Sequence, residues 1–194
     1  MSIKIGIAGP VGSGKTSIIE QLTNTLKEKY SLAIVTNDIY TTEDANYLKN
    51  QLDIDANRIV GVETGGCPHT AIRDDISANQ KAIEELEEKF SPDIIFVESG
   101  GDNLSATFSY ELIDYYMYVI DVAQGADIPR KKGAGLLFSD LLVVNKTDLS
   151  PYVEIDLLAM EKDVKANRKN KPYLFMNKKD DSLKKLVEWI EVLV

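Results

Sequence analysis

Short runs of apolar, often β-branched residues alternate along this chain with longer stretches whose apolar positions recur every three or four residues. The first pattern is typical of buried strands and the second of amphipathic helices. Their regular alternation predicts an α/β fold, a mainly parallel central sheet flanked by helices. The predicted strands are residues 3–8, 32–36, 58–62, 93–97, 115–121, 140–144 and 172–176, and the predicted helices are residues 16–29, 70–90, 152–165 and 182–194.

Two segments fit neither pattern. Residues 37–50 are mostly polar and are predicted to form a loop followed by a short helix. Residues 122–139 contain several glycines and a proline around a basic run, which predicts a mobile surface loop. No repeat, low-complexity tract or linker interrupts the chain, so residues 1–194 are predicted to form one domain.

Composition narrows the class of protein. The formal net charge of −9 would repel a polyanion, so we expect no nucleic-acid partner. A single cysteine cannot form an internal disulfide, which fits a reducing compartment. The N-terminus enters a strand without a signal peptide, and no apolar run is long enough to cross a bilayer. We therefore expect a cytoplasmic protein without a membrane partner.

A complete phosphate-binding loop pattern follows the first predicted strand and precedes the first predicted helix. Glycines allow backbone N–H groups to face phosphate oxygens, Lys15 would reach the β- and γ-phosphates, and the Thr16 hydroxyl would bind Mg²⁺. The residues predicted to contact the nucleotide here are Gly9, Pro10, Val11, Gly12, Ser13, Gly14, Lys15, Thr16 and Ser17.

A second nucleotide-binding pattern, Asn145-Lys146-Thr147-Asp148, follows a later predicted strand. The Asp148 carboxylate can accept hydrogen bonds from both N1–H and the 2-amino group of guanine, whereas adenine offers neither donor. A site built around such bonds rejects a base that lacks them. The sequence therefore predicts GTP rather than ATP, read by Asn145, Lys146 and Asp148. Asn177, after the last predicted strand, is predicted to close over the base.

Acidic residues end three of the predicted strands. Mg²⁺ needs more oxygen ligands than Thr16 supplies. Asp38 and Glu63 occupy positions from which they would face Mg²⁺ and the γ-phosphate, and Glu98 would orient the attacking water. The commoner role of such acids, as solvated loop residues or helix caps, is the alternative. No glutamine or arginine is evidently placed to assist, so we expect slow GTP hydrolysis without a partner.

The only cysteine and the only histidine, Cys67 and His69, lie two residues apart after the third predicted strand. Thiolate and imidazole suit Ni²⁺, Cu²⁺ or Zn²⁺, but a closed site normally needs about four donors. A second copy of the chain is the simplest source of the other two. Two alternatives remain open, a buried thiol beside a surface imidazole and a Cys67 nucleophile activated by His69.

Five segments together resemble the urease accessory GTPase family, the G proteins of nickel delivery, over nearly the whole chain. The most specific is the run Glu-Thr-Gly-Gly-Cys-Pro-His within residues 62–73. The related hydrogenase-maturation GTPases look different at this position. The other matching segments are residues 9–16, 36–40, 98–108 and 145–148.

This resemblance implies a P-loop GTPase that forms a homodimer when GTP and Ni²⁺ bind. Cys67 and His69 from each chain would enclose one Ni²⁺ in a square-planar site, with Zn²⁺ as the alternative ion. Asp38 and Glu63 would be the Mg²⁺-facing switch residues, and Asp75 an outer partner of His69. The implied partners are the other urease accessory proteins, including a nickel metallochaperone, and apo-urease as the recipient of nickel.

Three other functions remain as alternatives. The same scaffold would serve a GTPase that delivers metal to a hydrogenase or another enzyme. A nickel or zinc sensor, with incidental hydrolysis, would use the same Cys67 and His69. A small-molecule kinase would share the phosphate-binding loop, although the guanine pattern at residues 145–148 argues against it.

Overall fold

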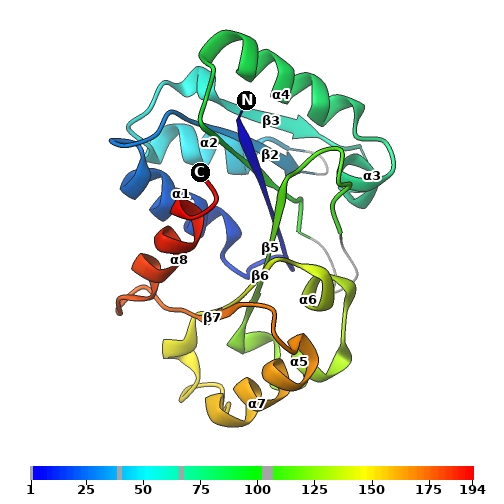
Figure 1. Cartoon of the computed structure of the whole chain (residues 1–194), viewed down its shortest axis with the longest axis vertical. Coiled ribbons are helices and arrows are strands. Elements are labelled where there is room, and N and C mark those ends of the chain that lie inside the picture. The colour runs from blue at the N-terminus through cyan, green and yellow to red at the C-terminus, as the bar shows by residue number, and fades with distance from the viewer. Residues whose placement is uncertain (1, 39–40, 66–67, 102–106) are drawn as a thin grey trace.

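The centre of the molecule is a seven-stranded sheet with the order β3-β2-β4-β1-β5-β6-β7, in which all neighbouring strands are parallel (Figure 1). The computed structural model describes residues 2–38, 41–65, 68–101 and 107–194. The predicted fold class is confirmed, and every predicted strand is present. The strands are β1 (Ile3–Ala8), β2 (Leu32–Asp38), β3 (Ile59–Glu63), β4 (Ile94–Glu98), β5 (Tyr115–Asp121), β6 (Leu141–Asn145) and β7 (Tyr173–Phe175).

Helices cover both faces of the sheet. One face packs against α1 (Lys15–Leu26), α2 (Glu43–Gln51) and α8 (Ser182–Glu191). The other packs against α3 (Pro68–Arg73), α4 (Ser77–Phe90), α5 (Ile128–Lys131), α6 (Ala134–Phe138) and α7 (Leu157–Arg168). Short 3-10 turns occupy Ala56–Arg58, Val122–Gln124 and Thr147–Leu149.

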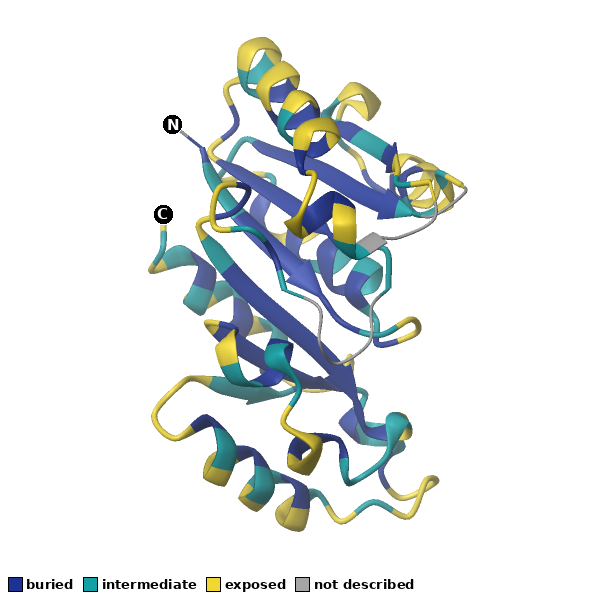
Figure 2. Ribbon diagram, turned by 90° about the vertical axis from the view of Figure 1, so that its right-hand side faces the viewer, coloured by how far each residue is buried: buried dark blue, intermediate teal, exposed yellow. Residues whose placement is uncertain are grey.

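Alternate side chains of each central strand enter the two cores. In β4, Ile94 and Phe96 face the α1 side, and Ile95 and Val97 face the α4 side. A strand buried on both faces is apolar at consecutive positions, which explains the continuous apolar runs in the sequence. Figure 2 shows the buried strands between helices whose outer faces are exposed.

The predicted helix over residues 70–90 is wrong, because the structure divides it into α3 and α4. Asp75 Oδ1 accepts hydrogen bonds from Ser77 N at 3.3 Å and from Ser77 Oγ at 2.7 Å. These bonds, which lower the pKa of Asp75, form a side-chain turn just before α4, whose N-cap residue is Ile76, where a continuous helix was expected. The apolar spacing continues across the break, which is why the pattern alone missed it.

The prediction of a surface loop at residues 122–139 is also wrong. The segment contains α5 and α6, and Leu136 is fully buried. Gly135 lies so close to Tyr118 that a Cβ atom would sit 2.3 Å from its ring. The glycine, read from sequence as a mark of flexibility, instead permits close packing of α6 on the sheet.

The boundaries of the later helices differ from the predictions by a few residues. Helix α7 begins after Asp156, whose side chain accepts from Leu158 N at 2.9 Å and Ala159 N at 3.2 Å. In the described part of the chain, every helix is too short or too polar to cross a membrane.

Candidate functional site

The register of the sheet brings the predicted site residues to one edge. Asp38 of β2 is paired with Glu63 of β3, and Thr36 with Glu98 of β4. On the other side of β1, Asp121 of β5 is paired with Asn145 of β6. Because the strands are parallel, all of these residues lie at carboxyl ends, where α/β sheets bind ligands.

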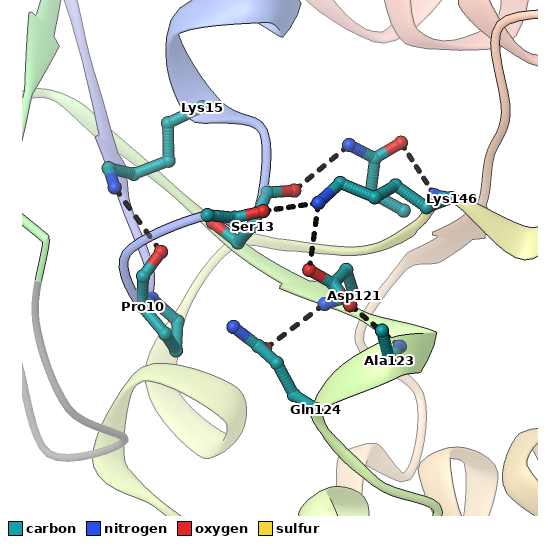
Figure 3. A network of polar contacts seen from close by, with 9 residues as sticks. Pro10, Ser13, Lys15, Asp121, Ala123, Gln124 and Lys146 are labelled. Atoms are coloured by element: carbon teal, nitrogen blue, oxygen red, sulfur yellow. Dashed lines mark hydrogen bonds and ion pairs between the residues drawn. The ribbon is translucent and has the colours of Figure 1, made fainter. Parts of the chain in front are cut away.

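The loop between β1 and α1 directs the N-terminus of α1 into this edge. Gly14 is the N-cap of α1 and has a φ of 98°, a left-handed conformation that glycine adopts without steric cost. Pro10 O accepts from Ser13 N at 3.1 Å and from Lys15 Nζ at 3.4 Å (Figure 3). The buried Lys15 ammonium therefore lies within the loop that an incoming phosphate would occupy.

The segment predicted to read guanine also contacts the loop between β1 and α1. Asn145 Nδ2 donates to Ser13 O at 3.0 Å. Lys146 Nζ donates to Gly12 O and forms an ion pair with Asp121 Oδ2 at 3.1 Å, so that it joins the loop to β5 (Figure 3). Asp121 was not predicted as a site residue; its only sequence signal was an acid that ends an apolar strand.

Two adjoining cavities follow from this arrangement. The larger, of about 500 Å³, is lined by Val11, Gly12, Gly14, Lys15, Thr16 and Ser17 of the loop region, by Gly100 and Gly101, by Asp38, and by Asp44 and Tyr47 of α2. The smaller, of about 330 Å³, is lined by Asn145, Asp148, Leu149, Lys178 and Lys179. Both share Gly14, Ser17 and Lys146. Two cavities of this kind match the phosphate and base compartments predicted for a nucleotide.

Asp148 lines the smaller cavity with its carboxylate paired to a lysine. Lys179 Nζ lies 2.9 Å from Asp148 Oδ2, and this pairing raises the pKa of Lys179. Asn177 is not among the residues that line this cavity, and its predicted closure over the base stays a prediction. Its amide donates to Thr147 Oγ1 at 3.2 Å and to Asp180 Oδ2 at 2.7 Å, which ties the loop after β7 to the turn that holds Asp148.

The acidic side chains near Thr16 differ in their burial and in their hydrogen bonds. Glu98 is fully buried, and Thr16 Oγ1 donates to its Oε1 at 2.7 Å. Burial raises the pKa of Glu98 to about 7. Asp44, which the sequence analysis did not identify, lies 3.4 Å from Thr16 Oγ1, and burial raises its pKa as well. Asp38 Oδ2 accepts from Thr41 Oγ1.

These residues fit a magnesium ion held together with phosphate oxygens. Glu98 Oε2 is buried and has no hydrogen-bond partner among the described residues. A buried carboxylate oxygen without a donor is costly unless an ion or its water is bound nearby. No group of three or more His, Cys, Asp or Glu within the described ranges would hold a metal by itself. Thr16, with one or two carboxylates and the substrate, is the donor set that Mg²⁺ prefers.

The segment after β3 that contains Cys67 and His69, here called the metal loop for its predicted role, is only partly described. Glu63 is exposed at the end of β3, and Thr64 N donates to Asp38 O at 2.8 Å, which fastens the start of the loop to β2. His69 lies in the first turn of α3. Cys67 lies outside the described residues, so its predicted role in binding metal stays a prediction.

Comparisons with known proteins identify the family of the chain. Residues 3–175 match the family model described as CobW/HypB/UreG, nucleotide-binding domain. A urease accessory protein UreG from Aliarcobacter butzleri is 80% identical over 195 residues, covering 100% of both chains. A urease accessory protein UreG from Micrococcus luteus is 58% identical over 96% of this chain and 93% of its own length.

Solved structures show the same fold at low sequence identity. The crystal structure of HypB from Helicobacter pylori in complex with nickel has a TM-score of 0.81 at 20% identity, covering 98% of this chain and 86% of that one. HypB from Archaeoglobus fulgidus has a TM-score of 0.77 at 21% identity, covering 99% and 90%. With a P-loop GTPase fold, a family match over most of its length and a relative that is 80% identical, the chain belongs to the CobW/HypB/UreG family and, within it, to the urease accessory proteins of the UreG type.

Proposed function

We propose that this chain is a GTP-hydrolysing metallochaperone that dimerises with GTP and Ni²⁺ and releases the nickel for assembly of the urease active site. The observation that carries the proposal is the pairing of Asp38 with Glu63 at the ends of β2 and β3. It places the strand that leads into Cys67 and His69 beside a residue that lines the phosphate cavity.

The base compartment supports GTP as the nucleotide. Asp148 is the carboxylate that lines it, and the Asn145 and Lys146 side chains hold the phosphate loop. An acceptor of this kind pairs with N1–H and the 2-amino group of guanine, and it would be left without a donor by adenine.

The phosphate compartment supports hydrolysis. Lys15 would move from Pro10 O to the β- and γ-phosphates, and the backbone N–H groups at the start of α1 would bind phosphate oxygens. Mg²⁺, when bound, would neutralise charge on the phosphates, and Thr16, Asp38 and Glu63 are the residues proposed to face it. Glu98 fixes the Thr16 hydroxyl and, through its free oxygen, would order a water beside the γ-phosphate.

The short path from Glu63 to the metal loop supports nickel release as the function of hydrolysis. Only three residues separate Glu63 from Cys67. Loss of the γ-phosphate would release Asp38 and Glu63 together. The loop that carries Cys67 and His69 would then separate from the same loop of the other protomer. Cys67 and His69 from each protomer would complete the four donors that Ni²⁺, or Zn²⁺ as the alternative, requires. The proposed partners are the other urease accessory proteins, a nickel metallochaperone among them, and apo-urease, in the cytoplasm.

Solution mass by light scattering tests the proposal on wild type, Cys67→Ala and His69→Ala. Each protein is measured alone, with Ni²⁺, with Mg²⁺ and a non-hydrolysable GTP analogue, and with all three. We expect a wild-type dimer that needs both nickel and nucleotide, and monomers throughout for both variants. A wild-type monomer under every condition, with nucleotide binding confirmed separately, would contradict the shared nickel site.

A further inference from the structure

Two fully buried asparagines lie between the phosphate cavity and the helix that carries His69. Asn37 is in β2 next to Asp38, and Asn79 is near the start of α4. Asn37 Nδ2 donates to Asn79 Oδ1 at 3.0 Å, and Asn79 Nδ2 donates to Asn37 Oδ1 at 2.8 Å. We call this pair the amide bridge. Buried amides are destabilising unless their hydrogen bonds are made, so the geometry of this pair is tightly constrained.

The outer hydrogen bonds of the amide bridge reach two other elements. Asn37 Nδ2 also donates to Glu98 O at 2.9 Å, and Asn79 Nδ2 also donates to Ala71 O at 2.9 Å. Both outer partners are backbone carbonyls, which only accept, so they fix the orientation of both amides. Each amide nitrogen then uses both of its hydrogens. Neither side chain can rotate without breaking bonds, and the end of β4 is thereby connected to α3.

Each end of the amide bridge meets one of the proposed sites. At the nucleotide end, the Glu98 side chain holds Thr16 while the Glu98 carbonyl holds Asn37. At the metal end, Ala71 lies two residues beyond His69 within α3, a helix of only six residues. Asn79 itself belongs to the longer α4, which buries Ala82, Ile83 and Leu86 in the core.

We propose that Asn37 and Asn79 are positioning residues that make the placement of α3, and so of His69, depend on the state of the nucleotide site. This inference rests on the proposed function and adds the residues through which the two sites communicate. A shift of the Glu98 backbone on binding or loss of Mg²⁺ and nucleotide changes the hydrogen bonds of Asn37. Because the amide bridge has no unused donor, Asn79 and the Ala71 carbonyl must adjust with it.

A merely structural role would lower stability but leave communication between the sites unchanged. The test therefore measures a coupling factor, the ratio of the apparent Ni²⁺ dissociation constant without nucleotide to that with Mg²⁺ and a non-hydrolysable GTP analogue. Calorimetric titration with Ni²⁺ at one fixed protein concentration gives both constants. Asn79→Ala is the main variant because Asn79 lines neither nucleotide cavity. Asn79→Asp is the second, and it keeps the side-chain volume if the first fails to fold.

Asn167→Ala is the matched control. Like that of Asn79, its amide nitrogen donates two hydrogen bonds, here to Pro129 O at 2.9 Å and Asp163 O at 3.1 Å, and thereby joins α7 to α5. Asn167→Ala thus loses two side-chain hydrogen bonds, against three in Asn79→Ala, without touching the amide bridge. Wild type and Asn167→Ala should show the same coupling factor, well above one. The Asn79 variants should bring it to within about threefold of one while their GTP-analogue affinity stays within about threefold of wild type.

Three results would overturn the inference in distinguishable ways. A wild-type coupling factor in a folded Asn79 variant would reduce the amide bridge to a structural element and leave the proposed function intact. A large loss of nucleotide affinity in that variant would place Asn79 in the nucleotide site itself. A wild-type protein with no Ni²⁺ binding, or with a factor of one, would contradict the proposed function and the inference together.

Discussion

Thr16 Oγ1 donates a hydrogen bond of 2.7 Å to Glu98 Oε1, which leaves the lone pairs of the hydroxyl free to face the phosphate cavity. The acceptor is fully buried at the end of a central strand. The orientation of the proposed magnesium-binding hydroxyl is thus set by the protein before any ion binds. That preorganisation requires a carboxyl group to remain buried, which has a consequence for stability.

We expect the stability of the protein without metal and nucleotide to depend on the ionisation of Glu98. Burial raises its pKa from 4.5 to about 7, so the folded state holds a proton that the unfolded chain has released. This contribution is complete below about pH 4.5, declines as the pH rises, and is lost above about pH 7. The total is on the order of 3 kcal/mol.

Thermal unfolding in EDTA between pH 5 and 8 checks this expectation. The difference in melting temperature between wild type and Glu98→Gln should fall by several degrees as the pH rises, because the neutral amide does not titrate. A difference that stays constant over this range would show that Glu98 is not the group responsible.

Gly14→Ala should weaken nucleotide binding more than Gly12→Ala. Both glycines have positive φ, 98° and 77°, so each alanine brings a similar backbone strain of about 1 kcal/mol. A Cβ at Gly14 would also sit 2.4 Å from Asn145 Nδ2, whereas one at Gly12 meets no described atom within 4 Å. Displacing Asn145 breaks its bond to Ser13 O.

The GDP dissociation constants of the two variants, from fluorescence titration, measure this difference. We expect Gly14→Ala to bind at least about tenfold more weakly than Gly12→Ala, which corresponds to about 1.4 kcal/mol. Equal losses would mean that the contact between residue 14 and Asn145 does not contribute to binding.

The parts of the site that the sequence predicted are those encoded by local patterns. The loop that contains Lys15 and the segment that ends at Asp148 each join a recognisable strand to a turn, and both lie at the predicted edge of the sheet. Asp38 and Glu63 end neighbouring strands, so even their pairing follows from the parallel topology.

The parts that the sequence did not predict depend on contacts between distant segments. Asp44 and Lys179 are ordinary charged residues in their own segments, and only folding brings them to Thr16 and Asp148. Asn37 and Asn79 are separated by 42 positions, with α2, β3 and α3 between them, and buried asparagines have no periodic signature. The break between α3 and α4 was missed because the local hydrogen bonds between Asp75 and Ser77 accompany a turn that leaves the apolar spacing unchanged.

Arg168→Met should destabilise the fold while leaving the nucleotide site formed. The Arg168 guanidinium is buried and donates to Ser139 O at 3.0 Å, Asp140 O at 3.2 Å and Pro172 O at 2.7 Å, and also to Leu136 O. Burial lowers its pKa to about 10, so it remains charged at neutral pH. Removing it takes donors away from several carbonyls, those of the buried residues Leu136 and Ser139 among them, at a cost of about 2–4 kcal/mol.

Urea denaturation compares this variant with Arg130→Ala, whose exposed guanidinium pairs with Asp163 at 3.4 Å. The control should change the free energy of unfolding by less than about 0.5 kcal/mol, as exposed pairs usually do. An Arg168→Met midpoint equal to that of wild type would show that other donors replace the guanidinium.

Lys179→Met should bind GDP more tightly than wild type at low ionic strength. The Lys179 ammonium is 2.9 Å from Asp148 Oδ2, the carboxylate proposed to accept guanine, so the ion pair must loosen as the base enters. Exposed pairs are weak, which limits the expected gain to about two- to fivefold. Salt screens the pair, so the gain should disappear at about 0.5 M salt. Lys178→Met is the matched control, because Lys178 lines the same cavity. Weaker GDP binding in Lys179→Met than in Lys178→Met would instead mean that Lys179 contacts the bound nucleotide.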